Sequence, residues 1–370
     1  MPSPDVNELT SRVARAQSLM REAGVDVLLL SPGADLRYLS GYAAIALERL
    51  TCLVLPAEGD PRLVVPRLEQ PAAAASPAGE FLEIVVHEET DDAFRLVADF
   101  CGAAMSVGLA NRMWAEQVLR FRSVMDAEQV TAGGVLRDLR MRKTATEVAA
   151  LRAAGGAIDR VHARMGEWLQ PGRTEAEVGR DIAEAIVAEG HETVNFVIVG
   201  SGPNGASPHH HVSERVINAG EPVVVDIGGT NTAGYCSDET RTYIAGGEPP
   251  DDFTAYYTVL EQAQRAACEA VRPGVTAAFI DSVARDIITD AGYGEYFVHR
   301  TGHGIGLEEH EDPYIVAGND AALEPGMAFS VEPGIYLPGR HGARIEDILV
   351  VTEAGAEPLN REPHELAVLG

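Results

Sequence analysis

The sequence predicts an α/β domain over residues 1–130, followed by an α+β domain over residues 131–370. Three observations support this prediction. The length of 370 residues is typical of about two domains. In the first part, short apolar runs alternate with segments of helical periodicity, as expected of an α/β sheet. Beyond residue 130, long amphipathic segments come before a last third that is rich in strand-like and glycine-containing sequence.

The first domain is expected to alternate strands with helices. Residues 8–22 repeat apolar side chains at three- and four-residue steps, which is typical of an amphipathic helix. Residues 25–30 form an apolar run that stops at Ser-Pro-Gly, which indicates a buried strand. Further strands are expected at 51–55, 62–65, 83–87 and 107–109, with a helix at 93–100.

The second domain is expected to begin with helices. Residues 126–170 are rich in helix formers and end at Pro171-Gly172, and a second helix is expected over 175–189. The change of pattern places the domain boundary near residue 130. The remaining elements are strands at 193–199, 221–227 and 241–244 and helices at 253–271 and 279–291, followed by strands and turns.

Charge and composition exclude several classes of protein. The net charge is −27, which is unfavourable for binding a nucleic-acid backbone. Lys143 is the only lysine and no Gly-Lys pair occurs, so a phosphate loop of the Walker type is absent. The four cysteines, at 52, 101, 236 and 268, form no CxxC pair and are expected to be reduced, buried thiols.

Targeting and membrane signals are not apparent in the sequence. The N-terminus lacks the basic-then-apolar order of a signal peptide. The longest apolar runs fall well short of the ~20 residues that cross a bilayer. We therefore expect a soluble, cytoplasmic protein with neither nucleic acid nor membrane as a partner.

Two aspartates in the second domain are expected to lie side by side. Asp226 ends an apolar strand, and Asp238 follows twelve residues later, after a glycine-containing turn. A hairpin that folds back at 230–234 would place the two carboxylates next to each other. Two such carboxylates repel unless one takes up a proton or a cation lies between them. Taken alone, an aspartate after a strand is more often a turn or cap residue.

Two glutamates and a histidine extend this pattern. Glu332 and Glu346 are surrounded by apolar, strand-like sequence, where a glutamate is rarely buried without a partner. His303 lies between glycines, which allow the backbone a close approach. The four carboxylates carry a formal charge of −4, which two divalent cations would balance. Manganese, cobalt, zinc and iron all suit such an oxygen-rich site. Each residue alone has an ordinary structural explanation, so the argument depends on their joint occurrence.

The order of these segments carries a specific resemblance. Residues 131–360 resemble the pita-bread metallopeptidases, on the segments DIGG, SDETRT, GHGIG followed by HE, VEPGIY and RIED. This family includes Xaa-Pro dipeptidases (prolidases), Xaa-Pro aminopeptidases, methionine aminopeptidases and the metal-free creatinases. The resemblance implies a creatinase-type α/β N-terminal domain, beginning with a segment like 35–42, and an α+β pita-bread catalytic domain. Methionine aminopeptidases lack the N-terminal domain, so its presence favours the Xaa-Pro branch.

The resemblance also implies a complete set of metal ligands, which the creatinases lack. One departure is that the interval between the two aspartates is one residue longer than is common in the family, with 231–234 as the expected place of the insertion. The implied ligands of two divalent ions (manganese, cobalt or zinc) are Asp226, Asp238, His303, Glu332 and Glu346.

Further residues acquire roles from the same resemblance. His209 matches a histidine that shuttles protons or contacts substrate, although His210 and His211 lie beside it and the choice rests on spacing alone. The others are His310, expected to hold the scissile carbonyl, His299, expected to line the proline pocket, and Arg344, expected to neutralise and orient the site. The alternative for each histidine is local hydrogen bonding or surface exposure.

The implied activity is hydrolysis of the bond before proline in short peptides. Glu332 would take the proton of the attacking water and relay it to the leaving nitrogen, with His209 as a second candidate for this role. The compact N-terminal domain favours Xaa-Pro dipeptides as substrates, and an Xaa-Pro aminopeptidase acting on longer peptides is the alternative. A catalytically inactive peptide-binding module is disfavoured because all five ligands are present. A calcium-binding domain is also disfavoured, because the EF-hand loop pattern is absent.

A homodimer is implied as well. In the family, the N-terminal domain commonly reaches the partner subunit's site. Arg37 or Arg49, the latter next to Glu48 in an apolar stretch, is a candidate for limiting substrate length or for meeting a substrate terminus. The alternative is that these residues are ordinary surface charges.

Overall fold

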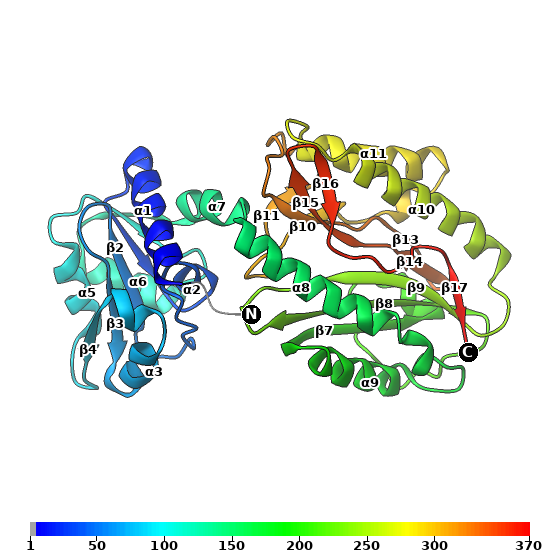
Figure 1. The fold of residues 1–370 in the computed structure, drawn as a ribbon, viewed down its shortest axis with the longest axis horizontal. Coiled ribbons are helices and arrows are strands. Elements are labelled where there is room, and N and C mark those ends of the chain that lie inside the picture. Colours follow the sequence, from blue (N-terminus) through cyan, green and yellow to red (C-terminus); the bar gives the residue numbers. More distant parts are fainter. Residues whose placement is uncertain (1–4) are drawn as a thin grey trace. The chain divides into compact units, whose positions relative to one another are not determined.

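The computed structural model describes residues 5–370. Residues 1–4 begin the segment that lacks a signal-peptide pattern, and they lie outside the described residues. The chain divides into two compact units, Met1–Arg140 and Met141–Gly370 (Figure 1). Among residues 5–370, none of the helices combines the length and apolarity needed to cross a bilayer.

The first unit is built on a six-stranded mixed sheet in the order β4-β3-β2-β1-β5-β6. The strand β1 (Val27–Leu30) is buried along its whole length, which explains its uninterrupted apolar sequence. The other strands are β2 (Cys52–Pro56), β3 (Arg62–Pro66), β4 (Glu83–His87), β5 (Ser106–Leu109) and β6 (Glu128–Thr131). The helices are α1 (Val6–Ala23), α2 (Ala34–Ser40), α3 (Gln70–Ala75), α4 (Ala78–Phe81), α5 (Ala93–Cys101), α6 (Ala115–Val124) and α7 (Gly133–Met141), with a 3₁₀ turn η1 (Arg67–Glu69).

The strand β6 lies within residues 126–170, where a continuous helical stretch was expected. Its sequence, EQVT, contains a single apolar residue, so no periodicity marks it as a strand. It forms because it pairs in parallel with β5, from Ser106 opposite Glu128 to Leu109 opposite Thr131. The sheet of the first unit therefore extends past residue 130, and the division between the units lies after Arg140.

The second unit contains four long helices as well as strands, and Figure 1 labels each of these helices. These are α8 (Ala145–His162), α9 (Glu175–Ala188), α10 (Asp251–Ala270) and α11 (Ala277–Asp290). One core cluster packs α8 and α9 against the four-stranded sheet, and another packs α10 and α11 against strands of the last third. The short 3₁₀ segments are η2 (Met165–Glu167), η3 (Gly202–Ala206) and η4 (Gly294–Tyr296).

The strands of the second unit form three sheets. The four-stranded sheet has the order β17-β9-β8-β7, the five-stranded sheet has the order β11-β10-β12-β15-β16, and β13 pairs with β14. The bounds are β7 (His191–Ser201), β8 (Glu221–Asn231), β9 (Glu239–Ala245), β10 (Gly302–Gly304), β11 (Glu311–Ile315), β12 (Ala328–Val331), β13 (Gly334–Leu337), β14 (His341–Arg344), β15 (Asp347–Thr352), β16 (Gly355–Pro358) and β17 (Ala367–Leu369).

Capping fixes the starts of α8 and α9. Thr144 and Glu147 form a reciprocal capping box at the start of α8, and Thr174 and Glu177 form another at the start of α9. Each box satisfies backbone N–H groups that have no partner within the helix. The start of α9 is therefore well determined, and its first residue, Glu175, is fully buried.

Candidate active site

The β8–β9 hairpin brings Asp226 and Asp238 to one face of the sheet. Asp226 pairs directly with Thr240, and Asp238 lies two residues before Thr240. Because side chains alternate along a strand, Asp238 points to the same face as Asp226. The two aspartates have carboxylate oxygens within 4.8 Å of each other, in a group that also includes Glu346. The expected juxtaposition of the two aspartates is confirmed.

The tip of this hairpin accommodates the longer interval. The side-chain oxygen of Asn231 accepts hydrogen bonds from the backbone N–H groups of Ala233 and Tyr235, at 3.0 and 3.1 Å. Gly234 has a φ of 90°, which glycine adopts without strain. The pairing register stays constant from the β8–β9 ladder up to the turn, since Ile227 lies opposite Glu239 and Thr230 lies opposite Cys236. The turn therefore leaves the aspartates in register.

Glu332 and Glu346 come from a second pair of strands. In the β12–β15 ladder, Val331 pairs with Asp347, so the two glutamates occupy the next positions at the end of the ladder. The Oε2 atom of Glu346 accepts a hydrogen bond from Thr240 Oγ1 at 2.7 Å. Because Thr240 is also the partner of Asp226, this contact ties the two ladders together at the carboxylates.

His303 presents one ring nitrogen to these carboxylates. Its Nδ1 lies 3.1 Å from the carbonyl oxygen of Gly304, which only accepts, so the proton resides on Nδ1. Its Nε2 lies 3.2 Å from Oε1 of Glu332 and 3.7 Å from Oδ2 of Asp238. Burial, together with the nearby His310, lowers the pKa of His303 to about 3, so the ring is neutral. The Nε2 lone pair therefore faces two carboxylates.

The carboxylates destabilise one another in the absence of a cation. Burial, and then repulsion from Glu346 and Asp226, raise the pKa of Asp238 well above its usual range. Burial and repulsion from Glu332 do the same to the pKa of Glu346. Burial also raises the pKa of Glu332 to about 7, although the positive charge of Arg344 opposes the shift. A cation among these groups would remove the repulsion.

Two buried oxygens fit a metal site. Oδ1 of Asp226 and Oε1 of Glu346 are buried and have no hydrogen-bond partner within residues 5–370. Such atoms are rare in proteins and call for an explanation. Potential ligand atoms lie within 4.8 Å of one another in three overlapping groups: Asp238 with His303 and His310, His303 with Glu332 and Glu346, and Asp226 with Asp238 and Glu346. Four carboxylates and one neutral imidazole suit divalent manganese, cobalt or zinc.

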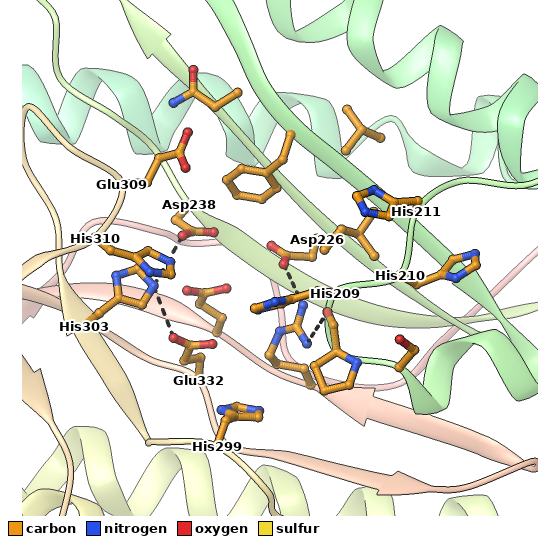
Figure 2. Close-up of a pocket in the computed structure, with 18 of the residues that line it drawn as sticks. His209, His210, His211, Asp226, Asp238, His299, His303, Glu309, His310 and Glu332 are labelled. Carbon is orange, nitrogen blue, oxygen red and sulfur yellow. Dashed lines mark hydrogen bonds and ion pairs between the residues drawn. The ribbon is translucent and has the colours of Figure 1, made fainter. Parts of the chain in front are cut away.

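These groups line a pocket of about 950 Å³ (Figure 2). Apolar side chains of β7, including Phe196 and Ile198, form part of its wall. Its volume is in the range of sites for small ligands. All nine residues predicted from the sequence to bind metal or substrate line this pocket: Asp226, Asp238, His303, Glu332, Glu346, His209, His299, His310 and Arg344.

Arg344 and His299 meet at a tyrosine that the sequence analysis did not single out. Arg344 donates hydrogen bonds to Oδ2 of Asp226 at 2.6 Å, to Thr240 Oγ1 at 2.9 Å and to the Tyr336 hydroxyl at 2.8 Å. Nε2 of His299 lies 2.8 Å from the same hydroxyl. Burial, and then the charge of Arg344, lower the pKa of His299 to about 4, so His299 is neutral. Tyr336 is the last residue of the VEPGIY segment, and its place in that segment is the sequence feature that could have identified it.

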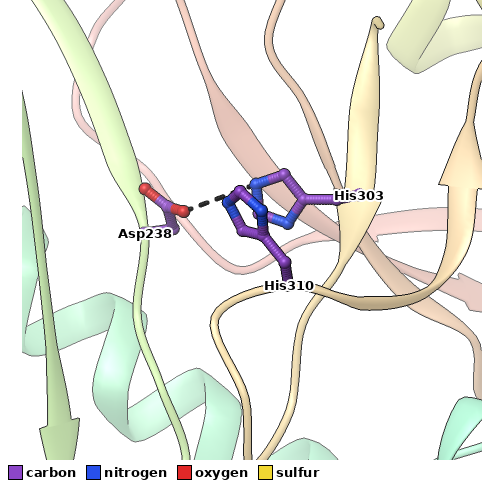
Figure 3. Close-up of side chains that lie close together, drawn as sticks. All are labelled: Asp238, His303 and His310. Atoms are coloured by element: carbon purple, nitrogen blue, oxygen red, sulfur yellow. Dashed lines mark ion pairs between the residues drawn. The ribbon is translucent and has the colours of Figure 1, made fainter. Parts of the chain in front are cut away.

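His310 lies against His303. Their ring centroids are 3.8 Å apart, and Figure 3 shows both rings beside Asp238. Nδ1 of His310 lies 3.1 Å from Nη2 of Arg300, a second pocket residue that the sequence analysis did not identify. The sequence feature that could have indicated Arg300 is its position directly after His299. Glu309, beside His310, is a third such residue in the pocket wall.

The structure separates the three consecutive histidines. Figure 2 shows His209 near Asp226 in the middle of the pocket, with His210 and His211 farther to one side. His210 is held by Glu175, with its Nε2 2.8 Å from a carboxylate oxygen.

The N-terminal candidates Arg37 and Arg49 belong to the first unit, where Arg49 pairs with Glu48 and Glu89, both at 2.6 Å.

Comparisons with known proteins agree with this geometry. Residues 149–353 match metallopeptidase family M24, and residues 12–142 match the Creatinase/Prolidase N-terminal domain. The chain belongs to metallopeptidase family M24. The expected combination of a creatinase-type α/β domain with an α+β pita-bread catalytic domain is confirmed, and so is the expected class of metal-dependent hydrolase.

Relatives within the family cover nearly the whole chain. A probable dipeptidase PepE from Mycobacterium bovis is 55% identical over 99% of this chain and 98% of its own length. An Xaa-Pro dipeptidase from Lactobacillus delbrueckii is 37% identical over 96% of this chain and 98% of its own length. The crystal structure of dipeptidase PepE from Mycobacterium ulcerans superposes with a TM-score of 0.96 at 54% identity, covering 100% of both chains.

Proposed function

We propose that this protein hydrolyses the peptide bond before proline in Xaa-Pro dipeptides, using two divalent ions (manganese, cobalt or zinc). The observation that carries the proposal is the pair of unpartnered buried oxygens, on Asp226 and Glu346, next to the neutral His303 in a peptide-sized pocket. Membership of family M24 supports it, and so does the similarity to an Xaa-Pro dipeptidase over nearly the whole chain.

The ligand set follows from the donor atoms. Asp226, Asp238, His303, Glu332 and Glu346 would hold the ions. When bound, such ions lower the pKa of a water molecule and polarise a carbonyl group. The contact between Arg344 and Oδ2 of Asp226 leaves Oδ1 available for a cation, and the contact between Thr240 and Oε2 of Glu346 leaves Oε1 available in the same way.

Glu332 is suited to proton transfer. Glu332 is also a candidate ligand, so its carboxylate would lie beside a water held by the ions and could accept the proton of that water. Its Oε1 accepts a hydrogen bond from Ser330 Oγ at 3.0 Å, which fixes the orientation of the carboxylate. We assign Glu332 the transfer of the water proton to the leaving proline nitrogen, with His209, which lies near Asp226, as the second candidate.

Two other histidines are assigned to the substrate. His310 packs against His303, so a substrate carbonyl near the ions would lie within reach of its ring. We assign His310 the stabilisation of negative charge on that oxygen. His299, neutral and packed edge-on against Phe297 at 5.3 Å, presents a mostly apolar surface suited to a proline ring.

A substrate panel tests the proposal. Met-Pro and Ala-Pro-Ala are incubated with protein loaded with manganese, cobalt or zinc, and the released products are quantified. We expect rapid cleavage of Met-Pro and weak cleavage of Ala-Pro-Ala. Efficient tripeptide cleavage would instead assign the protein to the Xaa-Pro aminopeptidases. Absence of any metal-dependent cleavage by a folded protein would contradict the proposal altogether.

We further propose a homodimer in the cytoplasm. The four cysteines are free, as is usual in a reducing compartment. The dimer rests on the resemblance of the two-domain organisation to the Xaa-Pro peptidases. Light scattering coupled to size exclusion tests it, with twice the chain mass of 39.4 kDa as the expected result.

A further inference from the structure

A buried carboxylate outside the ligand set organises the segment that carries His209. Glu175, the first residue of α9, has 0% of its surface exposed. All the side-chain and backbone donors that contact its carboxylate come from residues 201–213, which run from the last residue of β7 toward β8. They are Ser201 N at 2.8 Å, Ser201 Oγ at 2.7 Å, Asn204 Nδ2 at 3.0 and 3.1 Å, His210 Nε2 at 2.8 Å and Ser213 Oγ at 2.6 Å.

The carboxylate is ionised, and backbone contacts support the same segment. Burial opposes ionisation, but hydrogen bonds from Ser213 and Ser201 outweigh it and lower the pKa of Glu175. The backbone N–H of Ala176 donates to the carbonyl of Ser213 at 2.9 Å, and that of Glu175 donates to the carbonyl of Arg215 at 3.1 Å. The beginning of α9 is therefore bonded to the far end of the histidine segment, and its positive end stabilises the carboxylate.

The segment that carries His209 is also held in place by contacts with β14, near the proposed metal ligands. The carbonyl of Pro208, the residue before His209, lies 3.4 Å from Nη1 of Arg344. The turn η3 packs against β14 so closely that a Cβ on Gly342 would overlap the carbonyl of Gly205. His209 thus extends between two fixed contacts, the Arg344 contact at Pro208 and the Glu175 contact at His210. Its ring lies near Asp226 (Figure 2).

We propose that Glu175 is a positioning residue that holds His209 in the pocket by binding His210 and the serines on either side of it. A single carboxylate joins four residues of a 13-residue segment, Ser201, Asn204, His210 and Ser213, so its loss would release the whole stretch. Glu175 does not line the pocket and acts only through this segment. The inference rests on the proposed function, because the role of His209 belongs to the proposed hydrolysis.

A double-mutant cycle on the manganese-loaded enzyme tests the proposal. Glu175→Gln keeps the size of the side chain but replaces one acceptor oxygen with a donor, so the contacts of Ser201 with Oε1 and those of His210 and Ser213 with Oε2 cannot all persist. We expect kcat for Met-Pro to fall about tenfold, because catalytic groups displaced by ~1 Å lose efficiency steeply. In a His209→Ala background, the same substitution should cause no further loss, while metal content stays unchanged throughout.

Glu177→Gln is the matched control. Glu177 lies two residues along the same helix, its side chain hydrogen-bonds only to Thr174 within residues 5–370, and glutamine also serves in a capping box. It should leave kcat unchanged. An equal loss from Glu175→Gln in the wild-type and His209→Ala backgrounds would show a purely structural role and overturn the proposal. Full activity of His209→Ala would overturn it too.

Amide hydrogen exchange gives a readout that does not depend on hydrolysis. Glu175→Gln should accelerate exchange over residues 202–213 and leave α8 unaffected, and unchanged exchange over 202–213 would contradict the proposal. If the wild-type protein released no proline, the proposed function would fail, while the exchange experiment would still decide whether Glu175 holds the segment.

Discussion

Nε2 of His303 lies 3.2 Å from Oε1 of Glu332, while the other nitrogen of the same ring is bonded to the carbonyl of Gly304. A neutral imidazole lone pair and a carboxylate oxygen repel each other at this distance. Burial keeps the pKa of His303 at about 3, so protonation of the ring does not resolve the conflict at neutral pH. In the metal-free protein a proton on Glu332, whose pKa is raised to about 7, relieves the conflict, and a cation between the two atoms would replace that proton. This relationship underlies the predictions that follow.

Removing one ligand should weaken metal binding. Glu346→Gln eliminates a charge at a residue whose Oε1 is buried without a partner. We expect Mn²⁺ affinity, measured by isothermal titration calorimetry, to fall by at least about 10–100-fold, the range found for changes to residues that merely support ligands. Glu353→Gln, at an exposed position nearby in the sequence, is the control. Unchanged affinity in Glu346→Gln would remove Glu346 from the ligand set.

The metal-free protein should lose stability as pH rises. The pKa of Glu332 is about 7 in the folded chain and near 4.5 when unfolded, so the folded state binds more protons between these values. The free energy of unfolding should therefore decrease from about pH 4.5 to pH 7, by about 3 kcal/mol from this group. Asp238 and Glu346, whose pKa values are also raised, add to the trend.

Thermal unfolding with and without a chelator checks this pH dependence. With Mn²⁺ bound, the carboxylates are neutralised and the decline should disappear, because the ion favours the folded state. An identical pH profile in the two conditions would show that no cation binds among these groups.

Substitution of His310 should affect the chemical step. Losing one donor to a developing oxyanion typically lowers kcat by about 10²–10³-fold, so His310→Ala is expected to lose about 100-fold in kcat on Met-Pro. His211→Ala, an exposed histidine at the same pocket, serves as the comparison and should retain most of its activity. Equal rates for the two variants would argue against the assignment of His310.

His299 should determine affinity for the proline end of the substrate. His299→Ala removes a ring that packs on Phe297 and contacts Tyr336, and we expect KM for Met-Pro to rise about tenfold with a smaller change in kcat. Tyr336→Phe keeps the pocket shape and removes only the hydroxyl. Its KM should change less, and a larger effect from Tyr336→Phe would transfer the recognition role to that hydroxyl.

Much of the fold and of the site could be predicted from the sequence because the signals are local. The strand ending at Asp226 is a continuous apolar run, and the turn after it contains glycine, so the hairpin and its paired aspartates follow directly. Glu332 and Glu346 were recognisable as acids in apolar surroundings, which is an unusual environment for them. Sequence order then related these separate segments to a known family.

Other features depend on contacts between distant segments. The strand β6 has no apolar alternation and exists only through its pairing with β5. Tyr336 acquires its role from the meeting of His299 and Arg344, which no spacing reveals. The choice of His209 over its neighbours is supported by the contact of His210 with Glu175, 35 residues away.

Proline release as a function of added metal is the most direct test of the central claim. Metal-free protein is titrated with Mn²⁺, and the initial rate of Met-Pro hydrolysis is measured at each point. We predict no activity without metal, a rise that saturates at two equivalents per chain, and loss of activity on chelation. A folded protein that releases no proline at any Mn²⁺ concentration, or that releases it equally well in a chelator, would contradict the account.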